Sequence, residues 1–269
     1  MNQLVLTLNS DGVASPGMKA ARDASEIVRF ALHSFDNSDL SIAPPVAGHP
    51  IAYDMGTSAN NADERRTIYA NWILSQAFSE VARGIRESLE EAYFFLKIAK
   101  IHDGPMKADA FNALMRESRK EAQRAKFPDL IAKVNQGLTE ALVFAAEFHS
   151  LQKVRNCLEH RGGTVGAQDA DADGVLILSM PRIKLSYMRG TEEIELEPGC
   201  TVDPGDERKD VEIYSQRVTR TRAYRLGERI TFTADEFQEI AFACTLFLGD
   251  LVAKLPKATP GDLKRGKLV

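Results

Sequence analysis

The apolar positions between residues 61 and 101 recur at steps of three and four, which is the period of one face of an α-helix. That face would carry Phe78, Val81, Ile85, Leu89, Ala92, Leu96 and Ala99. Charged side chains such as Arg86, Glu87 and Glu90 fill the positions between them. The pattern therefore predicts one long amphipathic helix.

Similar spacing predicts four further helices. The segment HDGP at 102–105 ends the long helix, and a capping box of Thr233 with Glu236 begins the last one. Between them, apolar positions continue from Asp129 through Leu158 as one helical stretch. The remaining ranges are about 17–35, 106–125 and 233–255.

After Gly162 and Gly163 the period changes to strand-like alternation. Short strands are predicted at 174–179, 182–187 and 192–197, with a hairpin at Arg189-Gly190 joining the last two, and a second strand pair at 211–216 and 220–232. The fold class is therefore α+β and mainly α, with an up-down helical bundle.

These patterns divide the chain into four parts. The first, 1–58, has an alternating run near 4–8, one helix and a proline-rich loop at 41–50. A helical bundle follows at 59–163 and is completed by 233–255. The segment 164–232 is a strand-rich insert, and the tail 256–269 is expected to be mobile.

Composition excludes several classes of protein. No segment of the 269 residues approaches the roughly 18 apolar residues that a membrane span requires, and the N-terminus lacks the basic region of a signal peptide. We therefore expect a cytoplasmic protein. Cys157, Cys200 and Cys244 are far apart and odd in number, which favours reduced thiols. The net charge of −4 neither supports nor excludes RNA as a partner.

Three short motifs imitate ligand sites. The run DADADG at 169–174 begins like a calcium loop, but Met180 stands where a glutamate is needed. The run GDLKRGKL at 261–268 has Walker-loop spacing without the hydroxyl residue. Cys157 and His160 could form a thiolate pair, although a buried cysteine is the better interpretation. We expect no metal and no cofactor.

An arginine run overlaps the second predicted strand pair, and Tyr214 and Tyr224 are interleaved with it. Such a run could follow a nucleic-acid backbone. Acidic residues between 192 and 212 could equally pair with it across strands. Its members are Arg217, Arg220, Arg222, Arg225 and Arg229.

The segment VRNCLEHRGGTV at 154–165 supports two interpretations. As a helix terminus, it places His160 at the negative end of the helix dipole and Gly162 at a left-handed cap. As a site, it places Asn156 and His160, four residues apart, on the face opposite Leu151 and Val154. A polar face in that position is either solvated or faces a partner.

The motif Arg155-Asn156-x-x-x-His160, in a helical region that ends in glycines, resembles that of the HEPN superfamily (higher eukaryotes and prokaryotes nucleotide-binding). The resemblance covers roughly 60–163 and extends to 234–255. It implies a bundle of four or five helices and a metal-independent endoribonuclease of the toxin-antitoxin or defence type. Glu159 and Arg161 flank His160, a departure that bears on its pKa and access.

The resemblance also implies roles for residues. His160 would be the general base or acid, Arg155 would bind the scissile phosphate, and Asn156 would orient either of them. Two copies would meet through the motif face as a homodimer, with an antitoxin or nucleotidyltransferase as a further partner. RNA-binding residues would be Arg161, Arg217, Arg220 and Arg222.

Two alternatives stay open at this point. One is a non-catalytic dimeric HEPN module that binds a nucleotide or a protein. The other is an unrelated helical interaction protein in which the motif is only a helix cap.

Overall fold

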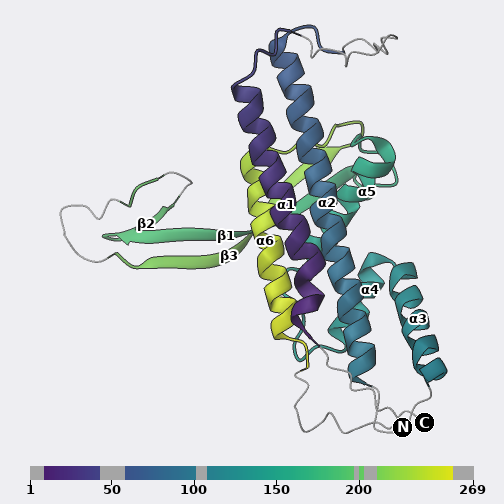
Figure 1. Ribbon diagram of the computed structural model, residues 1–269. Coiled ribbons are helices and arrows are strands. Elements are labelled where there is room, and N and C mark those ends of the chain that lie inside the picture. Colours follow the sequence, from purple (N-terminus) through teal and green to yellow (C-terminus); the bar gives the residue numbers. More distant parts are fainter. Residues whose placement is uncertain (1–8, 43–57, 101–107, 197–199, 203–210, 257–269) are drawn as a thin grey trace, which may run out of the picture.

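The computed structural model describes residues 9–42, 58–100, 108–196, 200–202 and 211–256. Within them it is mainly helical with one antiparallel sheet, which confirms the coarse fold class (Figure 1). The elements are α1 Asp11–Asp36, α2 Ala62–Ala99, α3 Ala108–Arg124, α4 Phe127–Asn135, α5 Ala145–Arg161, β1 Val175–Arg189, β2 Glu192–Glu195, β3 Ile213–Arg225 and α6 Ala234–Ala253. The alternating run near 4–8, the prolines of the 41–50 loop and the tail after Pro256 lie outside the described residues. No described helix has an apolar run long enough to cross a bilayer.

Helices α1, α2 and α6 lie side by side and form the long axis of the molecule (Figure 1). They meet at Gly17 and Gly84. A Cβ added to Gly84 would lie 2.5 Å from the Cβ of Ala20, and one added to Gly17 would lie 2.5 Å from a methyl group of Leu248. The backbone N–H of Gly17 donates to the Ser88 hydroxyl at 3.0 Å. Only glycine permits helices to approach this closely.

Helix α1 begins six residues before the predicted start at 17 and contains Pro16. The missing N–H of Pro16 would have bonded the carbonyl of Gly12, which lies in the exposed first turn where water can satisfy it. The helix buries Val13 and Val28 in the core that it shares with α2 and α6. Within the segment 1–58, α1 is therefore packed as part of the bundle.

The predicted single helix from Asp129 through Leu158 is wrong, because residues 136–144 interrupt it. The backbone N–H of Thr139 donates to the carbonyl of Lys254 at 2.9 Å, and that of Val143 donates to the carboxylate of Asp250 at 3.0 Å. Both acceptors lie at the C-terminal end of α6. Phe144 then adopts a left-handed conformation, with φ of 64°, directly before α5. Tertiary hydrogen bonds thus replace the helical ones.

The sheet has the order β2-β1-β3 and is antiparallel throughout. The hairpin at Arg189-Gly190 is confirmed, with Arg189 opposite Glu192. The predicted strands at 174–179 and 182–187 are one strand, and the predicted pair at 211–216 and 220–232 is one strand too, β3, which pairs with β1.

Pro181 lies inside β1 without interrupting it. Two residues earlier, the backbone N–H of Ser179 donates to the hydroxyl of Ser150 on α5 at 2.7 Å, and that hydroxyl donates to the carbonyl of Ile177 at 2.9 Å. Backbone groups of the odd-numbered residues therefore point away from β3. Since Pro181 has the same parity, its missing N–H removes no bond to β3.

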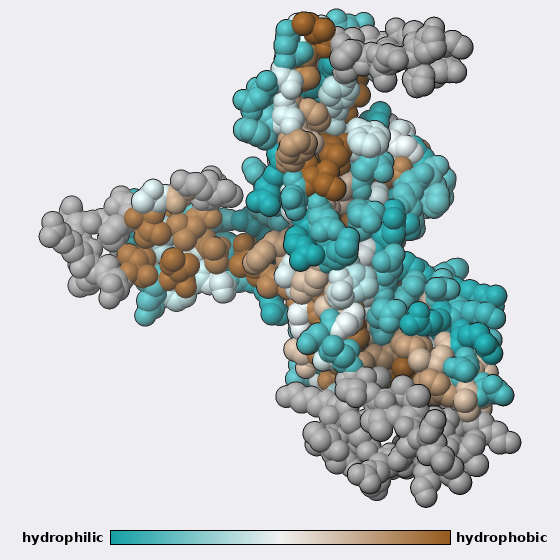
Figure 2. Space-filling view, in the orientation of Figure 1, coloured by the Kyte–Doolittle hydropathy of each residue, from teal (hydrophilic) through white to brown (hydrophobic). Residues whose placement is uncertain are grey.

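The sheet is anchored at one end and projects from the helices at the other, as an arm (Figure 1). Its anchored end buries Leu178 and Tyr224 in the core. Figure 2 shows apolar surface along the arm, where Leu185 is 42% and Ile213 57% exposed. The opposite face carries the ion pairs Arg182–Glu195 and Lys184–Glu193. The arm is therefore amphipathic.

We expect Gly17→Ala or Gly84→Ala to destabilise the protein by about 1–3 kcal/mol, because a new methyl group overpacks the contact. Gly249→Ala is the control, since a Cβ at this position in α6 meets nothing within 4 Å. It should stabilise by about 0.5–1 kcal/mol. Urea unfolding monitored by circular dichroism measures all three. Equal changes in the free energy of unfolding at the three positions would contradict a close approach of the helices at Gly17 and Gly84.

Candidate functional site

Helix α5 carries the motif at 155–160 and is held on three sides. Its buried face contains Phe148, Leu151 and Val154, each no more than 1% exposed. On one flank, the side-chain amide of Gln152 donates to the carbonyl of Ala82 in α2. On the other, the Ser150 hydroxyl bridges the edge of β1. The helix is thus fixed between α2 and the sheet, and only one face remains open.

Asn156 and His160 lie on that open face, and both are exposed. This confirms the placement that their four-residue spacing predicts. The helix terminus is confirmed as well: Gly162 is left-handed, with φ of 61°, and the N–H of Gly163 donates to the carbonyl of Cys157 at 3.2 Å. The segment is therefore a capped helix end that also displays two polar side chains.

Arg155 is not displayed in the same way. Its guanidinium Nη2 lies 2.6 Å from the carboxylate of Glu159, one helical turn further on, and its side chain is only 22% exposed. Its Nε is buried and has no hydrogen-bond partner. In the single chain, the guanidinium that would bind a phosphate is therefore already paired with Glu159.

Arg161 is committed to the turn that follows α5. Its guanidinium forms an ion pair with Asp169, whose carboxylate also accepts the backbone N–H of Gly166 at 3.0 Å. The neighbouring Asp171 accepts the backbone N–H groups of Asp173 and Val175 at 3.0 Å each. The acidic run therefore organises a turn. No cluster of three or more potential metal ligands occurs among the residues that the structure describes.

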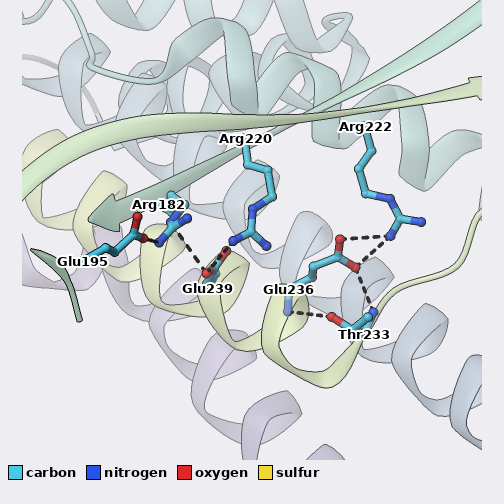
Figure 3. Close-up of polar contacts among 7 residues, drawn as sticks. All are labelled: Arg182, Glu195, Arg220, Arg222, Thr233, Glu236 and Glu239. Carbon is cyan, nitrogen blue, oxygen red and sulfur yellow. Dashed lines mark hydrogen bonds and ion pairs between the residues drawn. The ribbon is translucent and has the colours of Figure 1, made fainter. Parts of the chain in front are cut away.

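Two members of the arginine run face α6, as Figure 3 shows. Arg222 lies 2.8 Å from the carboxylate of Glu236, and Arg220 lies 3.3 Å from that of Glu239. Among the described residues, the acid partners of these two arginines come from α6 and not from the segment 192–212, of which 197–199 and 203–210 lie outside the described residues. Their guanidinium groups are engaged within the protein.

Arg217 and Arg229 lie at opposite ends of the run. Arg217 is exposed on β3, opposite Ile183 of β1. Arg229 is exposed, and its backbone forms a bridge with Thr164, four residues after His160. The structure thus brings Arg229, rather than Arg220 or Arg222, to the end of α5 that carries the motif.

Two further residues of α5 that line the same face were not identified from the sequence. His149 and Lys153 extend the spacing of Asn156 and His160 toward the start of the helix. Burial, and then the charge of Lys153, holds the pKa of His149 below its usual value. A search for basic residues at helical spacing could have found both.

Comparisons with protein-family models, with curated proteins and with solved structures found no match for this chain.

Cys157 is buried beneath the motif rather than displayed with it. Its sulfur lies 3.4 Å from the carbonyl of Thr164. Burial raises the pKa of the Cys157 thiol above its usual value, and burial raises that of Cys244 to about 12. Both thiols are therefore protonated near neutral pH, which disfavours a thiolate pair of Cys157 with His160.

We expect one of the three thiols to react rapidly with a thiol reagent in the native protein, because Cys200 is exposed and the other two are buried. Absorbance after addition of a disulfide reagent at pH 8 measures the reaction. Cys200→Ser should remove the fast phase, and unfolding in guanidinium should release the remaining two thiols. A fast phase that persists in Cys200→Ser would indicate that a buried thiol, such as that of Cys157, is reactive.

Proposed function

We propose that this protein is a homodimeric, HEPN-like endoribonuclease that works without a metal ion. The observation that carries the proposal is the display of Asn156 and His160 on the open face of an otherwise anchored helix, with Arg155 one position away. Helices α2 to α5 and α6 would form the HEPN-like bundle around it. Fixed backbones suit such a site, because catalytic groups need defined positions.

The chemistry follows from the residue types. RNA supplies its own nucleophile, so the 2′-hydroxyl attacks the adjacent phosphorus and the bond from phosphorus to the 5′ oxygen breaks. His160 accepts the 2′ proton or protonates the leaving oxygen. Arg155 stabilises the charge on the phosphate, and Asn156 orients one of the two groups. The products are a 2′,3′-cyclic phosphate and a 5′-hydroxyl.

One chain supplies only half of this reaction, because His160 can serve one proton transfer at a time. A second copy, related by a two-fold axis that brings the two α5 faces together, would supply a second His160 and Arg155. The open face of α5 is free to meet it. The site therefore requires a dimer.

The ion pair of Arg155 with Glu159 favours one rival function, a non-catalytic dimeric module that binds a nucleotide or protein. In the ribonuclease, a phosphate must replace the Glu159 carboxylate on Arg155. In the binding module, the pair stays closed and the motif face serves assembly alone. If the segment were only a helix cap, neither Arg155 nor Glu159 would have a functional role.

Incubation with single-stranded RNA in EDTA should yield fragments that end in 2′,3′-cyclic phosphate. His160→Ala should reduce the rate by about 10²–10⁴-fold, the usual contribution of a general acid or base. His33→Ala is the matched control, because His33 is exposed on α1 and lies outside the motif. Gel electrophoresis of end-labelled RNA measures the fragments.

The same experiment separates the alternatives. Cleavage that His160→Ala leaves intact would contradict the proposal and indicate a contaminating nuclease. No cleavage by a wild-type protein that sediments as a dimer would favour the binding module. A monomer without cleavage would favour the helix cap.

Glu159→Gln should strengthen RNA binding by about threefold, because it removes a partner that competes for Arg155. An ion pair of this spacing contributes about 0.3–1 kcal/mol, and each 1.4 kcal/mol corresponds to a tenfold change in affinity. Filter binding with His160→Ala in the background measures the change without cleavage. Weaker binding by Glu159→Gln would show that Glu159 supports Arg155 instead of blocking it.

A further inference from the structure

The open face of α5 carries four polar side chains in a line. At 100° per residue, His149, Lys153, Asn156 and His160 fall within about 60° of one another. With a rise of 1.5 Å per residue, the line runs for roughly 16 Å along the helix. We call these four residues the α5 stripe. None of them makes a hydrogen bond or ion pair with the rest of the described chain. Lys153, Asn156 and His160 are exposed and His149 is partly buried.

Negative charge on α5 is kept away from the α5 stripe. The helix contains two acidic residues. Glu147 accepts a hydrogen bond from Thr219 of β3 at 2.7 Å, and Glu159 is 2.6 Å from Arg155. Each carboxylate is therefore drawn to a flank of the helix. The positive charge of Lys153 has no acidic neighbour along the α5 stripe to cancel it.

A further basic residue, Arg229, lies near the His160 end of the α5 stripe. The backbone of Ile230 donates to the carbonyl of Gly163 at 2.8 Å, and Arg229 is bridged to Thr164. These contacts bring the exposed Arg229 beside the turn that follows His160. The arginines that face α6, by contrast, already have carboxylate partners in Glu236 and Glu239.

We propose that the α5 stripe and Arg229 form a track for the phosphates of a single-stranded RNA, which leads the strand across Asn156 and His160. The inference rests on the proposed ribonuclease function and identifies its substrate contacts. Lys153 and Arg229 supply charge, while His149 and Asn156 supply hydrogen bonds. Single-stranded RNA fits because a flexible strand can follow a helix surface and turn one 2′-hydroxyl toward His160.

The track assigns RNA contact to Lys153 and Arg229, and not to Arg220 and Arg222, the two members of the arginine run that face α6. Arg220 and Arg222 would have to abandon α6 to reach RNA, and Arg222 would leave a carboxylate that also caps that helix. Within the described part of the chain, the side chains of Lys153 and Arg229 have no hydrogen bond or ion pair that a phosphate would displace. The affinity for RNA should therefore depend on Lys153 and Arg229 and not on Arg220 and Arg222.

The test uses a short single-stranded RNA whose 2′-hydroxyls are methylated, so that it binds without being cleaved. Fluorescence anisotropy gives its affinity for the full-length protein between about 0.05 and 0.2 M salt. Lys153→Gln and Arg229→Gln should each weaken binding roughly fourfold at 0.15 M salt and reduce the slope of log affinity against log salt by about 0.7, the value for one phosphate contact on a single strand.

Lys126→Gln is the matched control, since Lys126 is an exposed lysine at the start of α4 and should leave both quantities unchanged. RNA binding that Arg155→Ala weakens, but that neither Lys153→Gln nor Arg229→Gln changes, would overturn the track and leave the proposed function standing. Absence of binding by the wild type at the lowest salt would overturn both. Circular dichroism verifies that each variant is folded.

Discussion

The contact of α1, α2 and α6 at Gly17 and Gly84 is the constraint on which the other elements depend. Because these glycines let the helices approach closely, Leu248 reaches the α1–α2 crossing and α6 runs along both helices. The position of α6 then determines two distant features. Its C-terminal end holds the break at 136–144, and its first turns hold the base of the sheet.

The first turns of α6 show how one side chain can serve two purposes. Glu236 accepts the backbone N–H of Thr233, as a capping box requires, and the same carboxylate pairs with Arg222 of β3. Helix start and sheet position are therefore coupled through one residue (Figure 3). Glu239 repeats the arrangement one turn later with Arg220, while Arg182 of β1 approaches the same carboxylate. This coupling explains why two arginines of β3 have their guanidinium groups engaged within the protein.

Helix α5 has the opposite character, since it is anchored through its flanks and open on one face. The anchoring contacts of Gln152 and Ser150 use the carbonyl of Ala82 inside α2 and backbone groups on the edge of β1 that faces away from β3. The open face is then free for polar residues whose removal would leave the fold intact. Arg155 lies at the boundary between these regions, which accounts for both its limited exposure and its pairing with Glu159. A phosphate would compete with a carboxylate at that boundary.

The sequence by itself determined the features that depend on neighbours within a few residues. Periodicity predicted the long helix and the strands of the hairpin at Arg189-Gly190, and a four-residue motif predicted the capping box. Spacing predicted that Asn156 and His160 share an exposed face. These features follow from local geometry, because a helix face and a tight turn are defined by residues close in the chain.

Only the tertiary structure decided the rest. The break at 136–144 uses acceptors from α6, more than a hundred residues away, whereas the apolar spacing continues on its two sides and Gly137 is a weak local signal of a helix end. The continuity of β1 through Pro181 requires β3 as a partner and an edge that faces away from it. The partners of Arg222 and the proximity of Arg229 to the motif likewise arise from pairing between distant segments. A charge pattern states which residues can pair, whereas the packing of helix against sheet determines which of them do.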